Sequence, residues 1–294
     1  MMSAQKTNRR GFLKSVGLAA GSLGASRAFS STGFTAAPGG VPGAGTDGGF
    51  RLGLASYTFR AFGLDETLAM TRRLNLKRVC FKSYHLPLES SAAEIAEIAA
   101  KTKSAGLELY AAGVIYMTTE AEVNHAFDYA RAAGLEMIIG VPNWELLDGT
   151  EANIRRTGIS LAIHNHGPTD KLYPTPQSAY DRIRGRDPRL GLCLDVGHTQ
   201  RCGLDPSESA ERFFDRIIDV HIKDVSAATA QGDTVEAGRG VVDIPQILRT
   251  LLRLRYAGTV GMEFEKDEKD PLPGVAESLG YVRGCLAALG AGRP

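Results

Sequence analysis

Histidines and carboxylates gather at four points in the second half of this 294-residue chain. The four segments are His164-Asn165-His166, Asp195-Val196-Gly197-His198, His221-Ile222-Lys223-Asp224 and Glu263-Phe264-Glu265. Each lies at the end of a short apolar run, where charged groups are unusual because burying an unpaired charge is costly. Imidazole nitrogens and carboxylate oxygens bind divalent metals and also serve as enzymatic acids and bases. The segments therefore indicate a metal centre, an acid–base site, or both.

Side-chain alternation selects one residue from each segment. Successive side chains of a strand point to opposite faces, and apolar residues such as Leu194 and Ile222 mark the face that packs against helices. The set that points inward is His164, Asp195, His221 and Glu263. Two neutral imidazoles and two carboxylates can bind one divalent ion, for which Mn, Co and Zn suit the mixed ligands and Mg is a further option. The ion would also offset the repulsion between two buried carboxylates.

Each member of this set has a commoner structural role when taken alone. A histidine at a strand end is usually a hydrogen-bonded structural residue, an aspartate there is usually a helix N-cap, and a terminal glutamate is usually solvated. The metal prediction therefore depends on the four residues occurring on consecutive strands with one facing. Glu263 is in addition a candidate base.

Three more residues in these segments are candidates for catalysis. His166, which carries no metal in this scheme, can act as a base at neutral pH. His198 and Lys223 can bind substrate hydroxyls or a developing oxyanion. Lys223 has the alternative of a structural ion pair with a neighbouring aspartate, Asp219 or Asp224.

Candidate substrate-binding residues follow other predicted strands. Lys82 and His85 come after the second strand, Trp144 after the fourth, and Arg239 in a glycine-flanked loop after the seventh. Aromatic faces pack on sugar C–H surfaces, although the single Trp of a chain is as often plain core. Arg239 could reach a substrate oxygen or a phosphate, or could be an ordinary surface arginine.

Short apolar runs alternate with helical segments from Phe50 onward. Eight runs predict strands at residues 52–58, 78–83, 107–117, 137–142, 160–166, 190–196, 217–225 and 259–264. Apolar residues at helical spacing predict helices at residues 90–105, 119–133 and 245–254. This alternation predicts an α/β protein with a single (β/α)8 TIM barrel over residues 50–290. A doubly wound open sheet is the alternative, which the lack of a G-x-G-x-x-G motif after any strand disfavours.

The N-terminus resembles a bacterial twin-arginine signal. Arg9-Arg10 are followed by Phe12-Leu13-Lys14. After these come an apolar run that is too short to span a bilayer and then small residues near Ala28. We therefore expect residues 1–28 to be a signal peptide, read by the twin-arginine export machinery and cleaved on export to the periplasm. The alternative is an amphipathic N-terminus that stays attached. Residues 29–49, with seven glycines, predict a flexible linker. The sequence has no second long apolar stretch, so we expect no stable membrane insertion.

Charge and cysteine content exclude some classes of protein. The formal net charge is +1, and without residues 1–28 the chain keeps 29 basic and 33 acidic residues, a net charge of −4. This balance disfavours nucleic-acid binding. Four widely spaced cysteines disfavour a zinc-finger framework, although a Cys193–Cys202 disulfide is open in an oxidising periplasm.

These motifs resemble the xylose isomerase-like barrel superfamily of sugar isomerases and epimerases over essentially all of residues 50–290. In that family an Asp-x-x-His segment supplies a metal ligand and a substrate-contacting histidine, which match Asp195 and His198. The next strand supplies a metal-bound histidine, which matches His221. The last strand supplies a metal-bound glutamate that also moves protons, which matches Glu263.

The fifth strand departs from the family pattern, because His164 stands where the family normally has a glutamate. Family epimerases use two carboxylates on opposite faces of a sugar carbon, and this symmetric pair is lost here. The resemblance implies a metal-dependent sugar isomerase/epimerase-like enzyme that abstracts a proton α to the carbonyl of a keto sugar through a metal-stabilised enediolate. The alternative is a lyase or hydratase that acts on 3-keto glycosides with the same site.

Two other classes stay open at this point. A related barrel family of nucleases acts on abasic DNA with three zinc ions, but it needs more ligands than six histidines suggest. A non-catalytic sugar-binding barrel would bind its sugar whether or not a chelator is present. For the enzyme interpretations that act on sugars, the expected partner is a small keto sugar or glycoside, and a homo-oligomer is compatible with the sequence.

Overall fold

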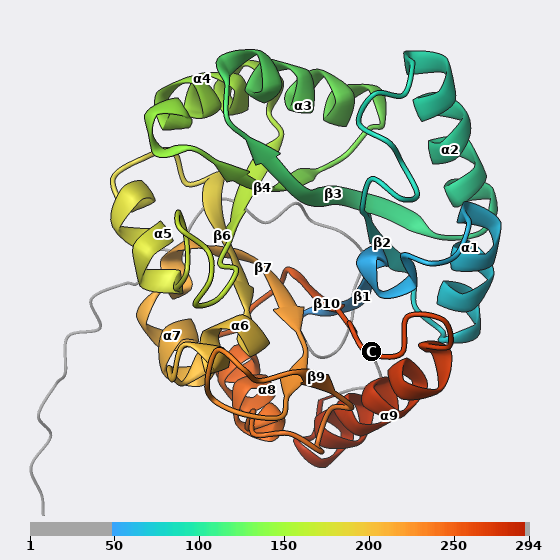
Figure 1. The fold of residues 1–294 in the computed structure, drawn as a ribbon, viewed down its shortest axis with the longest axis vertical. Coiled ribbons are helices and arrows are strands. Elements are labelled where there is room, and N and C mark those ends of the chain that lie inside the picture. The colour runs from blue at the N-terminus through green and yellow to red at the C-terminus, as the bar shows by residue number, and fades with distance from the viewer. Residues whose placement is uncertain (1–48, 292–294) are drawn as a thin grey trace, which may run out of the picture. The chain divides into compact units, whose positions relative to one another are not determined.

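The computed structural model describes residues 49–291 (Figure 1). The predicted signal peptide at residues 1–28 lies outside the described residues, as does the predicted linker at residues 29–49 except for its last residue. Both stay predictions. Among residues 49–291, no helix combines the length and apolar character that crossing a membrane requires.

Eight parallel strands close into a barrel, as the alternating pattern predicts, and the open sheet is excluded. Around the barrel the strands follow the order β1, β10, β7, β6, β5, β4, β3, β2. Their bounds are β1 Arg51–Ala55, β2 Arg78–Phe81, β3 Glu108–Met117, β4 Met137–Pro142, β5 Ser160–His164, β6 Leu190–Asp195, β7 Ile217–Ile222 and β10 Thr259–Met262. A separate two-stranded antiparallel hairpin is formed by β8 (Asp224–Val225) and β9 (Thr234–Val235).

Helices form an outer ring around the strands (Figure 1). They are α1 Leu64–Arg73, α2 Ala92–Ser104, α3 Glu120–Ala132, α4 Leu147–Thr157, α5 Pro176–Ile183, α6 Val196–Arg201, α7 Pro206–Arg212, α8 Ile244–Arg253 and α9 Leu272–Ala288, with short 3-10 turns at Ser56–Phe59, Trp144–Leu146 and Phe214–Arg216. The three helices expected from apolar spacing begin at side-chain N-caps, Ser91, Thr119 and Asp243, whose oxygens accept backbone N–H groups. These caps explain why the helices begin where the sequence indicates.

Two apolar layers hold the barrel together. The outer layer packs strands against helices and includes fully buried residues such as Leu161 and Ile163, each worth about 1.5–3 kcal/mol of burial. The inner layer fills the barrel and includes Tyr110 and Ile139. The barrel is thus a packed core, and the space for chemistry lies beyond the carboxyl ends of the strands.

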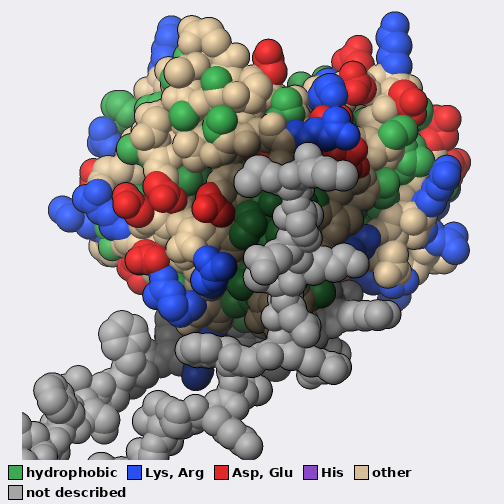
Figure 2. Space-filling model, turned by 90° about the horizontal axis from the view of Figure 1, so that it is seen from below, with side chains coloured by type: hydrophobic (Ala, Val, Ile, Leu, Met, Phe, Trp, Pro, Cys, Tyr) green, Lys and Arg blue, Asp and Glu red, His purple; other side chains and the backbone are tan. Residues whose placement is uncertain are grey.

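Charges of both signs are interspersed over the face of the molecule in Figure 2. This distribution agrees with the near-neutral sequence and differs from the clustered basic surface that nucleic-acid binding proteins present.

Several strands end earlier than the apolar runs predict. The first strand stops at Ala55 and continues as a 3-10 turn, β5 stops at His164, and β10 stops at Met262. The predicted strand at 217–225 is divided, because the chain leaves the barrel after Ile222 and pairs with β9 instead.

The Cys193–Cys202 disulfide that the sequence left open does not form. Both residues are free thiols. The Cys193 thiol lies inside the barrel and donates to Asp219 Oδ2 at 3.3 Å, whereas the Cys202 thiol donates to the Pro174 carbonyl at 3.3 Å. They therefore belong to different environments.

Candidate metal centre and active site

Four side chains from consecutive barrel strands converge at the carboxyl end of the barrel. His164, Asp195, His221 and Glu263 are all buried, and each offers one ligand atom within 4.8 Å of the others. His164 Nε2 lies 3.4 Å from Asp195 Oδ2, and His221 Nδ1 lies 3.4 Å from Glu263 Oε2. Strand pairing sets this arrangement, because Asp195 stands opposite His221. The inward set expected from side-chain alternation is thus brought together.

Asp195 has two tasks, one for each carboxylate oxygen. Its Oδ1 accepts the backbone N–H of His198 at 2.7 Å and caps α6, while Oδ2 faces the cluster. Asn165 fixes the backbone at this point, because its Oδ1 accepts the Asp195 N–H at 2.9 Å. The helix-cap and metal-ligand interpretations of Asp195 are therefore compatible.

The unpaired atoms of the cluster fit a metal ion. Both ring nitrogens of His164, both of His221 and Oδ2 of Asp195 are enclosed without a hydrogen-bond partner among the described residues. Buried polar atoms are nearly always partnered, so unpartnered atoms on three of the four residues, each of which offers one ligand atom to the cluster, need an explanation. Burial also lowers the pKa of His164 to about 4, which keeps the imidazole neutral, the form that binds metal.

A competing ligand set would replace the carboxylates with Cys193, which lies near His164 and His221. A thiol binds metal as a thiolate. Burial, together with the Asp219 carboxylate, raises the pKa of Cys193 well above its usual range. The set that contains Asp195 and Glu263 is therefore the better fit.

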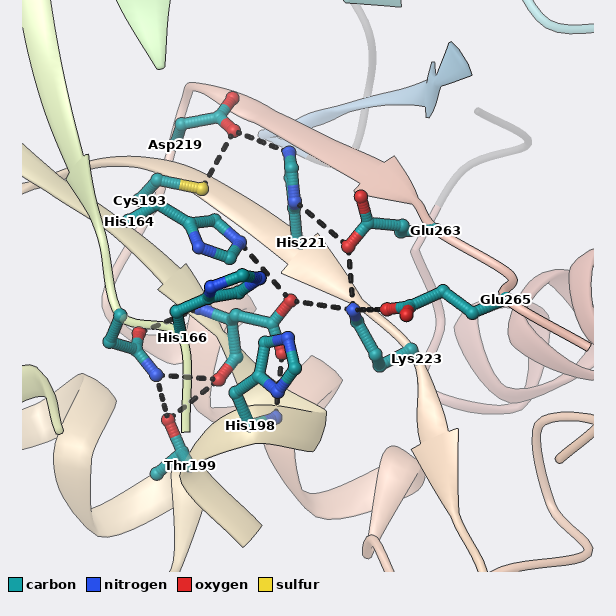
Figure 3. A network of polar contacts seen from close by, with 12 residues as sticks. His164, His166, Cys193, His198, Thr199, Asp219, His221, Lys223, Glu263 and Glu265 are labelled. Carbon is teal, nitrogen blue, oxygen red and sulfur yellow. Dashed lines mark hydrogen bonds and ion pairs between the residues drawn. The ribbon is translucent and has the colours of Figure 1, made fainter. Parts of the chain in front are cut away.

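Lys223 lies between the carboxylates of the cluster (Figure 3). Its Nζ lies 2.6 Å from Glu263 Oε2 and 3.1 Å from Asp195 Oδ2, and it also contacts Glu265 Oε1. The predicted partners Asp219 and Asp224 were wrong, because alternation places Asp219 deeper in the barrel and Asp224 binds backbone N–H groups of the following loop.

These contacts keep the carboxylates charged. Burial raises the pKa values of Asp195 and Glu263, but the Lys223 ammonium and the neighbouring histidines together outweigh burial and hold both well below their usual range. Burial lowers the pKa of Lys223, and the surrounding carboxylates reverse this and raise it. One ammonium faces three carboxylates, including Glu265, so the cluster retains negative charge that a divalent cation would balance.

His166 lies at the edge of the cluster and contacts two further residues. Its Nδ1 lies 2.6 Å from the Tyr116 hydroxyl, which in turn lies 3.5 Å from Asp170 Oδ2. Burial and the Asp170 carboxylate raise the pKa of Tyr116 to about 12, so the hydroxyl keeps its proton. The side chain of His166 is 41% exposed, in contrast to the enclosed His164.

A cavity of about 320 Å³ opens next to the cluster. The residues that line the cavity include His198 and Lys223, which adjoin the cluster, and also Arg201 and Lys266. The His198 ring lies 4.8 Å from the His166 ring and 5.8 Å from the His164 ring, measured between centroids. The two histidines expected to contact substrate are therefore neighbours at the mouth of the cluster.

Two of the predicted substrate-binding residues lie at the carboxyl end of the barrel, and their roles stay predictions. Lys82 Nζ donates to the Val114 carbonyl at 2.5 Å. Burial lowers the pKa of Lys82, and the nearby Glu263 carboxylate opposes the shift. Trp144 follows β4, is 40% exposed, and has the guanidinium of Arg182 4.0 Å from its ring centroid.

The other two predicted substrate-binding residues have structural roles. His85 is buried, and its ring nitrogens lie 2.8 Å from Thr67 Oγ1 and 2.9 Å from Ser56 Oγ, so neither is free for a substrate. Arg239 makes a two-pronged ion pair with Glu277 at 2.6 and 2.8 Å on the surface. These contacts engage both side chains in the protein itself, and the Arg239 ion pair agrees with the surface-arginine alternative.

The comparison with protein families decides the relationship that the motifs suggest. The family model described as xylose isomerase-like TIM barrel matches residues 56–285, which is most of the chain. The chain belongs to this family. The fold agrees, because residues 56–285 contain every strand of the closed barrel except β1.

The curated proteins that resemble this chain in sequence include inosose dehydratases and a rhizopine catabolism protein. The chain is 31% identical over 160 residues to an inosose dehydratase of Geobacillus kaustophilus, covering 48% of this chain and 50% of the relative. It is 29% identical over 150 residues to the rhizopine catabolism protein MocC of Rhizobium meliloti, covering 46% of each. The chain thus matches about half the length of these relatives.

Solved structures share the fold at lower identity. An IOLI protein with a bound zinc atom superposes with a TM-score of 0.69 at 16% identity, covering 81% of this chain and 99% of that one. An L-ribulose 3-epimerase superposes with a TM-score of 0.67 at 18% identity, covering 81% and 95%. At these identities the likeness shows the fold, which is the barrel of the xylose isomerase-like family.

Four residues that contact the site are not among the site residues predicted from the sequence. Alternation could have found Glu265 and Asp219, which stand two positions from Glu263 and His221. Helical spacing could have found Arg201, three residues after His198. Tyr116 gives no local signal, because its contact with His166 crosses from β3 to the loop after β5.

Proposed function

We propose that this protein is a metal-dependent enzyme that removes the proton next to the carbonyl of a keto sugar. The observation that carries the proposal is the convergence of His164, Asp195, His221 and Glu263 with unpartnered ligand atoms. These residues would hold one divalent ion, for which Zn, Mn or Co suits the mixed ligands. When bound, such an ion polarises a carbonyl and stabilises negative charge on its oxygen.

His166 is the base in this proposal. The ionised Asp170 carboxylate favours a chain in which the Tyr116 hydroxyl donates to Asp170 and accepts the Nδ1 proton of His166. The other ring nitrogen, Nε2, then carries a lone pair. It makes no hydrogen bond within the described part of the chain, so it is available to accept a substrate proton.

His198 and Lys223 would bind substrate oxygens from the cavity side. Both line the cavity and adjoin the cluster. An ammonium and an imidazole N–H can donate hydrogen bonds to an oxygen that gains negative charge as the proton leaves. Glu263, held as a carboxylate by Lys223, serves here as a ligand and not as the base.

Elimination of water is the net reaction that this arrangement favours. His166 takes the α-proton as the C–H bond breaks, a C=C bond forms, and the C–O bond of the β-hydroxyl breaks. The imidazolium then returns the same proton to the leaving hydroxide, which departs as water. One residue on one face suffices for this sequence. The inosose dehydratase relatives support it, and so does His164 in place of a second acid–base carboxylate.

Isomerisation is the second candidate, because it too needs one base. His166 would move the proton between adjacent carbons of the sugar through an enediol. Epimerisation is less well supported, since it needs proton donors on opposite faces and His164 is enclosed in the cluster.

Incubation of the metal-loaded protein with inosose and keto sugars in D2O tests the proposal. Elimination yields a dehydrated product, and isomerisation yields a deuterium-labelled isomer. His166→Gln should lower either rate by about 100-fold or more, and His125→Gln, an exposed histidine outside the site, serves as control. A rate unchanged in His166→Gln would remove His166 as the base. Equal sugar binding with and without chelator, and no turnover, would indicate a sugar-binding barrel instead.

A further inference from the structure

Arg201 lines the same cavity as His198 and contacts the Nδ1 atom of the His198 ring. Its Nη1 lies 3.3 Å from His198 Nδ1, and its Nη2 donates to the Ala230 carbonyl at 2.8 Å. Among the described residues, no carboxylate lies within ion-pair distance of Arg201. The contact with His198 is therefore not a by-product of a nearby salt bridge.

The chemistry of the guanidinium determines the direction of this hydrogen bond. An arginine side chain has five N–H donors, no acceptor, and keeps its charge in proteins. His198 Nδ1 must therefore be the acceptor, and a neutral imidazole with an acceptor at Nδ1 carries its proton on Nε2. We propose that Arg201 is the positioning residue that holds His198 as an Nε2–H donor aimed at a substrate oxygen.

The surroundings of the ring agree with this orientation. Gly167 has a φ of +86°, and a Cβ placed there would lie 3.0 Å from His198 Nδ1, so the glycine leaves the Nδ1 side free for the arginine. His198 Nε2 makes no hydrogen bond within residues 49–291 and is not one of the enclosed unpartnered atoms. Since His198 lines the cavity, Nε2 is the nitrogen that a ligand can reach.

The two neighbouring histidines then have opposite roles. Tyr116 and Asp170 favour a proton on Nδ1 of His166, which leaves Nε2 as an acceptor. Arg201 imposes the reverse on His198. Burial also lowers the pKa of His198 well below its usual range, so it stays neutral beside its arginine. In the proposed reaction, on which this role rests, His198 binds the oxygen that gains charge and takes no part in proton transfer.

Nitrogen NMR of histidine-labelled protein reads the tautomer directly. A long-range ¹H–¹⁵N spectrum of the metal-free protein, repeated with Zn²⁺, distinguishes a protonated from an unprotonated ring nitrogen. His198→Gln identifies the signal to assign. We expect the His198 proton on Nε2 in both spectra. A proton on Nδ1 in the unmodified protein would overturn the inference without any further variant, and this result does not depend on which reaction is catalysed.

Two variants of Arg201 and one control variant complete the test. Arg201→Lys keeps a donor and should keep the Nε2–H form, with kcat within a few-fold of the original. Arg201→Glu offers an acceptor and should move the proton to Nδ1, which lowers kcat by about 100-fold, as for loss of a donor to a developing oxyanion. Arg239→Glu, at a surface arginine, is the matched control. An unchanged His198 tautomer in folded Arg201→Glu would contradict the inference.

Discussion

Lys223 Nζ lies 2.6 Å from Oε2 of Glu263, the same oxygen that lies 3.4 Å from Nδ1 of His221. The ammonium therefore shares its carboxylate oxygen with a proposed metal ligand. Without an ion, Lys223 is the group that offsets the charge of the buried carboxylates. With an ion, the two cations share the same oxygens, so metal binding and the role of Lys223 are coupled.

Lys223→Met should destabilise the metal-free protein more than the metal-loaded protein. Removing one partner of a buried ion pair costs about 3–5 kcal/mol, because the other charge stays buried and unpaired. A divalent ion should recover part of this loss, so the rise in Tm on adding Zn²⁺ should be larger in Lys223→Met than in the original chain. Differential scanning calorimetry measures both, with the exposed Lys171→Met as control. An unchanged Tm of metal-free Lys223→Met would show that the cluster does not need the ammonium.

Tyr116→Phe should lower kcat by about tenfold while leaving the metal content unchanged. The hydroxyl holds Nδ1 of His166 at 2.6 Å, and a phenyl ring removes that contact without touching the four ligands. The expected size lies below that of losing the base itself, which contributes about 100-fold or more. Tyr84→Phe, a 56% exposed tyrosine, is the control. Equal kcat values for Tyr116→Phe and the control would remove the Tyr116 contact from the mechanism.

Arg239→Met should leave kcat and KM within about twofold of the original values. Its guanidinium pairs with Glu277 on the surface, and exposed ion pairs contribute about 0–1 kcal/mol to stability. Steady-state kinetics with the substrate found above checks this expectation. A large rise in KM would restore the substrate contact that the sequence suggests.

Asp187 should contribute stability that is lost in acid. Its hydrogen bond with the Arg189 side chain, together with one from the Arg189 backbone N–H, lowers the pKa of Asp187 from 3.8 to about 2. Because the folded-state pKa is depressed, the contribution is fully present above about pH 4 and disappears as the pH falls towards 2. Arg189 is 37% exposed, so solvent screening leaves about 1 kcal/mol.

Asp187→Asn should therefore flatten the stability–pH curve between pH 4 and 2 and lower stability at pH 7. Urea unfolding across this range measures the effect. Asp65→Asn, at a 74% exposed carboxylate in a surface ion pair with Lys101, is the control for loss of a surface ion pair. A parallel shift of the Asp187→Asn curve at all pH values would contradict the assigned cause.

The barrel and the four inward residues could be predicted because both follow from local periodicity. Alternation along a strand fixes which side chains share a face, and parallel strands bring their carboxyl ends to one rim. His164 and Asp195 therefore met as expected, although they are 31 positions apart in the sequence.

The partners of these residues could not be predicted, because they depend on loops beyond the strand ends. Lys223 directly follows the end of β7, and its ammonium contacts Glu265, which lies in the loop after β10. Arg239 lies after the β8–β9 hairpin, and its guanidinium pairs with Glu277 on α9. A position that is close to the site in the sequence therefore makes its contact elsewhere. Neither path has a periodic signal.

Metal stoichiometry tests the central claim most directly. Elemental analysis of protein purified without chelator, combined with calorimetric titration of Zn²⁺, should give one divalent ion per chain. His164→Ala should lose that ion, or bind it at least about 100-fold more weakly. His125→Ala should keep the ion, because His164 belongs to the cluster whereas His125 is exposed and lies outside it. No stoichiometric metal in the original chain, or equal binding by His164→Ala and His125→Ala, would contradict the account.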